Sequence, residues 1–248
     1  MPRYFLEVSY RGENYSGFQV QKNAITIQSE IEKAFKTLQR DEVVMTGSSR
    51  TDAGVHALQN FLHFDYDKEI HPHFAYKINS ILSDEIVIKN LIKVEPEAHC
   101  RFDAISREYN YYIYSHKDPF LKDRAYYYPY KLDLEKMEQA AEMLRRYQDF
   151  TSFSKRRTQV KSFICKVEES KWARENKSLV YYIKADRFLR GMVRALVATM
   201  LLVGREKISI DDFKNIILQK DSAKANFAVP AQGLFLISVN YPGGYFSR

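Results

Sequence analysis

Residues 47–57 read G-S-S-R-T-D-A-G-V-H-A and join two segments of strand character. Residues 43–46 before this run and 60–64 after it are rich in β-branched, apolar and aromatic side chains, which favour strands. We therefore expect a polar loop between two buried strands, and such loops are where a rigid scaffold presents reactive groups. Asp52 is the first candidate for a catalytic residue. The same run is also a competent turn, because Asp bonds to the backbone that follows it and Gly adopts positive φ.

The elements expected around this loop alternate in a regular order. A strand at 3–10 and a helix at 27–38 are followed by strands at 42–47 and 57–65, a helix at 72–82 and a strand at 86–94. Thr26 is the expected N-cap of the first helix, because its hydroxyl can accept a backbone N–H of the first turn. Ile27, Ile31 and Phe35 recur behind it at helical spacing. This β-α-β-β-α-β order predicts a ferredoxin-like split βαβ unit.

A similar order returns in the second half of the chain. We expect a strand at 105–115, a helix at 134–147 capped by Asp133, strands at 160–172 and 178–186, helices at 188–203 and 210–219, and a strand at 233–240. The sequence thus predicts an α+β fold of two ferredoxin-like halves that share a continuous, mostly antiparallel sheet with the helices packed on one face. No low-complexity linker separates the halves, which we place at 1–104, with the Asp52 loop, and at 105–248.

The positive charge of the chain is concentrated in its second half. The formal net charge is +7, and residues 1–100 hold 11 Lys and Arg against 14 Asp and Glu, whereas residues 101–248 hold 27 against 17. Aromatic residues make up 14% of the chain, with 18 Tyr and 16 Phe, and such rings suit surfaces that stack flat ligands. The expected partner is a nucleic acid that binds mainly to the basic second half.

The composition disfavours several other classes of protein. Cys100 and Cys165 are the only cysteines, too few for a zinc finger or a disulfide framework, and they favour a reducing cytoplasm. The N-terminal residues lack the apolar core of a signal peptide. The longest apolar run, residues 192–203, is interrupted by Arg194 and is too short to cross a membrane. Neither a phosphate-binding glycine loop nor a Cys or His spacing typical of a structural metal is present.

Three arginines near residue 190 form the second candidate group. Arg187, Arg190 and Arg194 are spaced i, i+3 and i+7, so they would share one face at the start of the helix expected at 188–203. Cations are unfavourable at the N-terminus of a helix, so three arginines there indicate a countercharge outside the helix. The alternative is a solvated cationic face.

Two further groups could bind a nucleic acid. The strand at 105–115 would place Arg107, Tyr109 and Tyr111 on one face, although tyrosines in strands are commonly part of the core. Lys155, Arg156 and Arg157 lie in a polar segment that is either a solvated turn or a phosphate clamp.

Taken together, these motifs resemble the tRNA pseudouridine synthase A (TruA) family. R-T-D-A-G-V-H-A at 50–57 is similar to the signature of that family. Further matches follow in the family's order: Y-x-G-x-x-Y-x-G-x-Q at 10–19, C-R-F-D-A-x-x-R-x-Y-x-Y at 100–111, D-F-T-S-F at 149–153, F-L-R-G-M-V-R at 188–194 and P-A-Q-G-L-F-L at 230–236. The resemblance covers nearly the whole chain.

The resemblance implies an isomerase that converts uridine to pseudouridine at positions 38, 39 and 40 of the anticodon stem-loop of tRNA. It also implies a homodimer with no metal and no organic cofactor. By the family's motifs, Asp52 is the catalytic residue, Tyr109 stacks on the flipped uracil and Arg190 pairs with the aspartate. Arg50 helps to hold the flipped nucleotide, and Lys155, Arg156 and Arg157 would contact the tRNA backbone. Whether Asp52 adds covalently to the sugar or removes a C2′ proton stays open.

The sequence departs from the family pattern at a few positions. Ser49 stands where Gly is usual, Phe18 where Trp is common, and Gly191 where Asn is common beside the F-L-R arginine. Thr51 and His56 are expected to support the loop rather than to react. A non-catalytic RNA-binding protein is the alternative in another class, and a metal-dependent nuclease is disfavoured because no cluster of carboxylates is present.

Overall fold

The computed structural model describes residues 1–156 and 160–246, which fall into two compact units. Unit 1 comprises residues 1–105 together with the segment that begins at Phe235, and unit 2 comprises residues 106–234. The expected division at residue 104 assigns this C-terminal segment to the second half instead. Unit 2 carries 25 Lys and Arg against 16 Asp and Glu and so holds the basic part of the chain.

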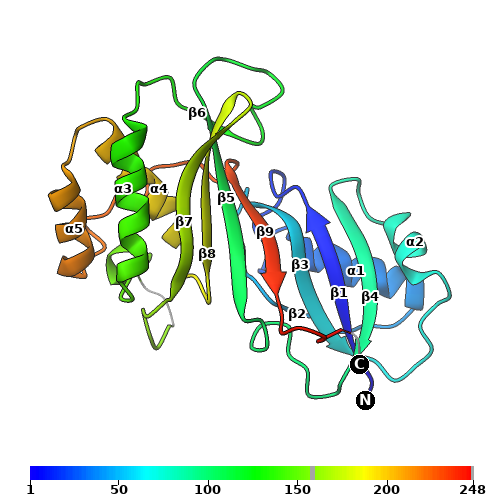
Figure 1. Ribbon diagram of the computed structural model, residues 1–248. Coiled ribbons are helices and arrows are strands. Elements are labelled where there is room, and N and C mark those ends of the chain that lie inside the picture. Colours follow the sequence, from blue (N-terminus) through cyan, green and yellow to red (C-terminus); the bar gives the residue numbers. More distant parts are fainter. Residues whose placement is uncertain (157–159, 247–248) are drawn as a thin grey trace. The chain divides into compact units, whose positions relative to one another are not determined.

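Unit 1 is built on an antiparallel sheet with a ferredoxin-like strand order. Its elements are β1 (Arg3–Tyr10), α1 (Ile27–Gln39), β2 (Thr46–Gly47), β3 (His56–Asp65), α2 (Phe74–Asn79), β4 (Ile86–Val94) and nearly all of β9 (Leu234–Asn240) (Figure 1). β1 is antiparallel to both β4 and β3, and the short β2 is antiparallel to β3. β9 also pairs with β3, but in parallel. The order β4-β1-β3-β2 is that of the predicted split βαβ unit.

The sheet of unit 1 is buried on both faces. Leu6 of β1 and its cross-strand partner Leu62 are fully buried, and on the same side of the sheet Phe64 packs edge-on against Phe35 of α1. Phe5 points to the opposite face, where aromatic rings of the C-terminal segment surround it, Tyr241 and Phe246 among them. The helices therefore cover one face and the C-terminal segment contributes to covering the other.

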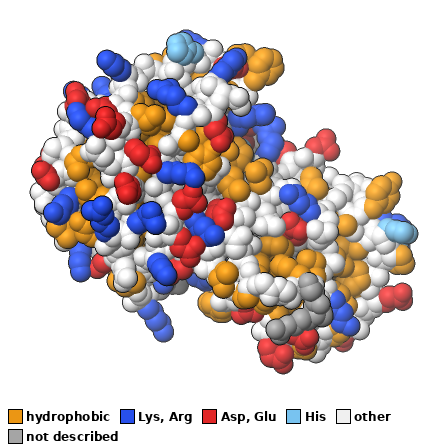
Figure 2. Space-filling model, viewed as in Figure 1, with side chains coloured by type: hydrophobic (Ala, Val, Ile, Leu, Met, Phe, Trp, Pro, Cys, Tyr) orange, Lys and Arg blue, Asp and Glu red, His pale blue; other side chains and the backbone are white. Residues whose placement is uncertain are grey.

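Unit 2 has a similar arrangement of strands and helices, but one of its helices is more apolar than α1 of unit 1. Its elements are β5 (Ser106–Tyr114), β6 (Tyr126–Tyr127), α3 (Leu134–Met143), β7 (Val167–Glu175), β8 (Ser178–Ala185), α4 (Met192–Gly204) and α5 (Ile210–Gln219) (Figure 1). β8 lies between β5 and β7 and is antiparallel to both. Nearly every residue of α4 is buried, because α3 and α5 both pack against it. On the face of unit 2 seen in Figure 2, Lys and Arg side chains alternate with acidic ones.

The predicted fold class is confirmed, since both units combine α-helices with mostly antiparallel strands and the helices pack on the sheet. The strand predicted at 42–47 is too long, since β2 spans only Thr46–Gly47. The backbone of Met45 is instead bonded to side chains of α1: its N–H donates to Glu32 and its carbonyl accepts from Gln28. The strand expected to begin at 160 begins at Val167, because Phe163 accepts a backbone bond from Phe150 instead. Among the described residues, no helix combines the length and apolar character needed to cross a membrane.

Candidate active site

The Asp52 loop, residues 47–57, is held by side chains of the two strands beside it. The hydroxyl of Tyr10, at the end of β1, lies 2.7 Å from that of Thr51. The amide of Asn60, on β3, donates to the carbonyl of Ser49 over 3.0 Å and accepts from the hydroxyl of Ser48 over 2.8 Å. Asn60 is fully buried, and Ser48, Ser49 and Thr51 are nearly so. These bonds fix the first half of the loop from within the unit.

A tight turn then places Asp52. Its carbonyl accepts from the N–H of Val55 over 3.2 Å, and Gly54 takes a φ of 79°, as the Thr-Asp-Ala-Gly sequence predicts. The segment after β1 lies directly against this turn. Gly12 is so close that a Cβ placed on it would be 2.0 Å from the carbonyl oxygen of Val55. The side chain of Asp52 is partly exposed. The loop therefore presents a solvent-accessible carboxylate on a backbone that neighbouring residues restrain.

His56 and Thr51 serve this restraint. The Nδ1 of His56 accepts from the N–H of Gly12 over 3.2 Å, and its ring stacks on Phe235 of β9 with centroids 4.5 Å apart. Only 2% of His56 is exposed. The bonds of both residues support the expectation that they shape the loop rather than react. Arg50, by contrast, is exposed at the loop surface.

In unit 2, the predicted Tyr109 and Arg190 are linked through one short segment. Tyr109, on β5, is partly buried and meets the ring of Phe188 edge-on at a centroid distance of 5.0 Å. Two residues further along, the carbonyl of Arg190 accepts from the N–H of Lys155 over 2.9 Å. The side chain of Arg190 is exposed. The fold therefore brings Tyr109, Arg190 and Lys155 to one region of the unit.

The prediction that Arg187, Arg190 and Arg194 share one face of a helix is wrong. Helix α4 begins at Met192, so Arg187 and Arg190 precede it, and only Arg194 lies in its first turn. The cause is Gly191, which caps the helix in the left-handed conformation with a φ of 76°. Asn, the residue common here in the family, is among the few others that tolerate this conformation. The guanidinium of Arg194 donates to the carbonyl of Val229 over 3.0 and 2.6 Å, which gives it a structural role.

Tyr111 lies in the core, whereas Lys155 and Arg156 of the cationic segment at 155–157 lie nearer the surface. Tyr111 is fully buried, its hydroxyl donates to the carbonyl of Pro230 over 2.7 Å, and burial raises its pKa well above the usual range, so it belongs to the core. Lys155 is partly buried with its side chain beside Gly191. Arg156 is exposed and contacts Asp221 at 3.4 Å. Arg157 lies outside the described residues.

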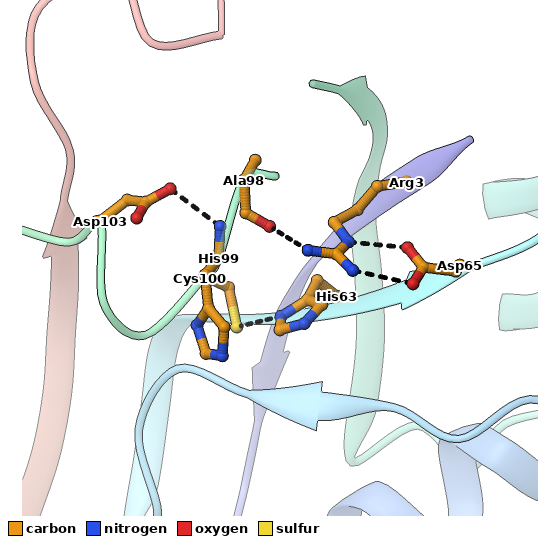
Figure 3. A network of polar contacts seen from close by, with 7 residues as sticks. All are labelled: Arg3, His63, Asp65, Ala98, His99, Cys100 and Asp103. Carbon is orange, nitrogen blue, oxygen red and sulfur yellow. Dashed lines mark hydrogen bonds and ion pairs between the residues drawn. The ribbon is translucent and has the colours of Figure 1, made fainter. Parts of the chain in front are cut away.

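The sequence motifs do not reveal a polar network in unit 1 that surrounds the turn at 99–103 (Figure 3). The Nδ1 of His63 lies 3.1 Å from the sulfur of Cys100, which also bonds to the carbonyl of Thr46. The carboxylate of Asp103 accepts from the N–H of His99 over 2.8 Å. His63 lies on β3, and the C-R-F-D-A motif begins at Cys100, but nothing in their spacing of 37 residues indicates contact.

Within this network the two histidines are kept in their neutral form. Burial, assisted by the nearby His99 and Arg3, lowers the pKa of His63 to about 4, and burial also lowers that of His99. The possible ligand atoms of His63, His99 and Cys100 lie within 4.8 Å of one another. The Nδ1 of His99, however, accepts from two backbone N–H groups, whereas a metal-bound histidine donates from its second nitrogen. The network therefore shapes the turn.

Comparison with known proteins defines the family. A family model described as tRNA pseudouridine synthase matches residues 7–103 and 140–242. A tRNA pseudouridine synthase A of Parabacteroides distasonis is 46% identical over 248 residues, which cover 99% of this chain and 98% of the relative. A protein of the same name from Bacteroides fragilis is 45% identical, over 98% of this chain and 98% of the relative. One from Staphylococcus aureus is 35% identical, over 94% of this chain and 89% of the relative.

The chain belongs to the tRNA pseudouridine synthase family. It is thus an isomerase that acts on tRNA and converts uridine to pseudouridine. The match includes both the Asp52 loop and the segment that carries Arg190.

Proposed function

We propose that this enzyme isomerises the uridines at positions 38, 39 and 40 in the anticodon stem-loop of tRNA, with Asp52 as its catalytic residue. The observation that carries the proposal is the Asp52 loop itself. Its R-T-D-A-G-V-H-A sequence matches the family signature, and the buried bonds of Thr51 and Asn60 restrain the backbone that presents the carboxylate. Such restraint is what positioning of a reactive group requires, since small misplacements cost large factors in rate.

The chemistry asked of Asp52 is stabilisation of a cleaved glycosidic bond. Breaking N1–C1′ develops positive charge on the sugar, which a carboxylate stabilises as it does in glycoside hydrolysis. The uracil then turns and forms a bond from C5 to C1′; C5 loses its proton and N1 gains one, so the product is an isomer of the substrate. Two routes use the carboxylate: addition to C1′, or removal of the C2′ proton. Deuterium at C2′ separates them, because only proton removal gives a primary isotope effect.

The other predicted residues would bind the nucleotide. A uridine in a stacked stem has to leave the stack before its sugar bond is accessible. Tyr109, with one side of its ring held by Phe188, offers a platform for the flipped uracil, and stacking of this kind contributes about 1–3 kcal/mol per base. Arg50 would hold the flipped nucleotide. Arg190 would act as the cationic partner of the carboxylate.

The tRNA backbone is assigned to the cationic residues of unit 2. Lys155, Arg156 and Arg157 are the proposed phosphate contacts, and the first of them is tied to Arg190 through the backbone. The enzyme is further proposed to act as a homodimer in the cytoplasm without a metal or organic cofactor. Light scattering of the purified protein would test the dimer, and activity retained in EDTA would support the absence of a metal requirement.

The substrate positions are tested with three tRNA transcripts, each with a uridine at only one of positions 38, 39 and 40. Each transcript is incubated with the enzyme, and pseudouridine is mapped by chemical labelling and primer extension. We expect product at all three positions and at no other uridine. Product only elsewhere in the tRNA would overturn the assignment to the stem-loop, and binding without product in any transcript would favour the non-catalytic alternative.

A further inference from the structure

Unit 1 contains a hollow beside the Asp52 loop. It has a volume of about 240 Å³ and is lined by Phe18 and Gln19 before α1, by Gln28 of α1, by residues 45–47 and Arg50, and by His99, Arg101 and Phe102 of the turn at 99–103. Binding pockets for whole drug-sized ligands usually enclose roughly 300–1,000 Å³, so this hollow suits a smaller group. Among the described residues that line it, no side chain is acidic.

Phe102 presents an aromatic ring at this hollow. The side chain is 73% exposed, although phenylalanine is among the residues most often buried. One neighbour of the ring is His99, with centroids 4.2 Å apart and planes 34° from parallel. The guanidinium of Arg101 lies 5.6 Å from the ring centroid. The ring is thus exposed while its position is set by flanking groups.

The network of Figure 3 holds the turn that carries this ring. The Nδ1 of His99 accepts from the N–H groups of Arg101 and Phe102, over 3.1 and 3.3 Å. Asp103 accepts from the N–H of His99, and also from the hydroxyl of Tyr245 over 2.6 Å. Cys100 anchors the turn in the interior of unit 1, where it is fully buried. An exposed aromatic side chain on a turn fixed by several hydrogen bonds is arranged as a binding platform, because little ordering remains to oppose binding.

The charges around the hollow point to a polyanionic ligand with flat groups. Arg50 and Arg101 line the hollow and are both exposed, so each can reach a phosphate. Aromatic rings interleaved with cations are the usual means of binding single-stranded nucleic acid, in which bases stack on rings and cations follow the backbone. The size of the hollow fits one base.

We propose that this hollow is a second nucleotide subsite, in which an unstacked base of the tRNA next to the reacting uridine stacks on Phe102 while Arg50 and Arg101 bind the adjoining phosphates. The inference rests on the proposed function, because it takes its ligand from the same tRNA. It extends the substrate contacts of unit 1 beyond the Asp52 loop. Flipping one nucleotide strains its neighbour, and a platform for the neighbour would stabilise the opened strand.

The test compares Phe102→Ala, Phe102→Leu and Phe102→Trp with the unaltered enzyme. Affinity for an anticodon stem-loop RNA is measured by titration, with 2-aminopurine placed in turn on either side of the uridine to report stacking. Loss of one stacked base should weaken binding roughly five- to 150-fold. We expect this loss, and loss of the 2-aminopurine quenching, for the alanine and leucine variants. Tryptophan, which supplies a larger flat ring, should retain both.

Tyr76→Ala is the matched control, because Tyr76 is also in unit 1 and 76% exposed but does not line the hollow. Its affinity should be unchanged, and thermal unfolding should show all variants folded. Alanine and leucine variants that bind and quench like the active, unaltered enzyme would overturn the subsite alone. An unaltered enzyme that forms no pseudouridine would overturn the proposed function, whatever Phe102 does.

Discussion

The Asp52 loop of unit 1 and the Arg190 segment of unit 2 hold their candidate site residues by different means. Around Asp52 the restraints are buried side-chain bonds, from Tyr10 and Asn60, and a close approach of Gly12. Around Arg190 they are a backbone bond to Lys155 and a left-handed Gly191. The side chain of Arg190 is exposed, whereas that of Asp52 is only partly so.

This difference matches two kinds of task. A short carboxylate has almost no reach, so its backbone has to be placed accurately, and the neutral buried groups around it do this without adding charge. A long arginine or lysine side chain can adjust to a phosphate or a carboxylate, so its backbone needs less support. The comparison predicts that the backbone around Asp52 is sensitive to changes of shape, whereas tRNA binding by the cationic residues of unit 2 is sensitive to changes of charge.

The largest effect is expected at Asp52. Asp52→Asn keeps the size of the side chain and removes its charge, so pseudouridine formation should fall roughly 10⁴-fold while tRNA affinity changes little. Single-turnover assays and filter binding measure the two quantities. Asp67→Asn, the same change at an exposed position of unit 1, is the control and should be fully active. Substantial activity in Asp52→Asn would exclude it as the catalytic residue.

The next largest effect tests the restraint itself. Gly12→Ala would place a methyl group 2.0 Å from the carbonyl of Val55, so the loop or β1 has to shift, at a cost of roughly 3 kcal/mol. Urea unfolding should show the loss, and activity should fall with it. Gly243→Ala is the control, because nothing described lies within 4 Å of that added Cβ. Equal stability of the two variants would show that the loop is not tightly packed.

A third prediction concerns pH. His63 has its pKa lowered to about 4, whereas in the unfolded chain it is about 6.5. Between these values the unfolded state binds a proton that the folded state does not, so stability is highest above pH 6.5 and falls as the pH drops towards 4, by up to about 3 kcal/mol. Urea unfolding between pH 4 and 7 measures it. His63→Gln should reduce the slope, and His116→Gln, at an exposed site of unit 2, should not.

The smallest effect is expected for the cations of unit 2. Lys155→Glu with Arg156→Glu should weaken tRNA binding roughly tenfold at low salt and reduce the slope of log affinity against log salt by about 2, because two phosphate contacts are lost. Lys33→Glu with Lys214→Glu makes the same change of net charge at exposed positions of α1 and α5. If both pairs behave alike, net charge and not these two residues determines the affinity.

Local signals in the sequence predict much of unit 1. Strands at 3–10 and 86–94 are found with the expected bounds, and Thr26 caps α1 through the N–H of Ser29, as its hydroxyl and position indicate. These features depend on neighbouring residues alone, which is why periodicity and capping find them. The turn at Asp52 is predicted in the same way, because its own Thr-Asp-Ala-Gly sequence indicates it.

What the sequence does not reveal depends on contacts between distant residues or on a single backbone conformation. Helix α4 begins later than predicted because Gly191 has a positive φ. The sequence alone does not indicate whether a glycine inside an apolar run caps a helix or continues it. The contact of His63 with Cys100 arises only once β3 and the turn at 99–103 come together. The assignment of Asp52, Tyr109 and Arg190 to one reaction depends on the family resemblance.

The pairing of β9 with β3 also sets an order in time. His56, which steadies the Asp52 loop, stacks on Phe235, and the ribosome makes all of unit 2 between these two residues. A nascent chain can therefore fold the elements of unit 2 while the loop still lacks one of its supports. The Asp52 loop would thus be among the last parts of the enzyme to mature, because its support from Phe235 becomes available only after the ribosome has made all of unit 2.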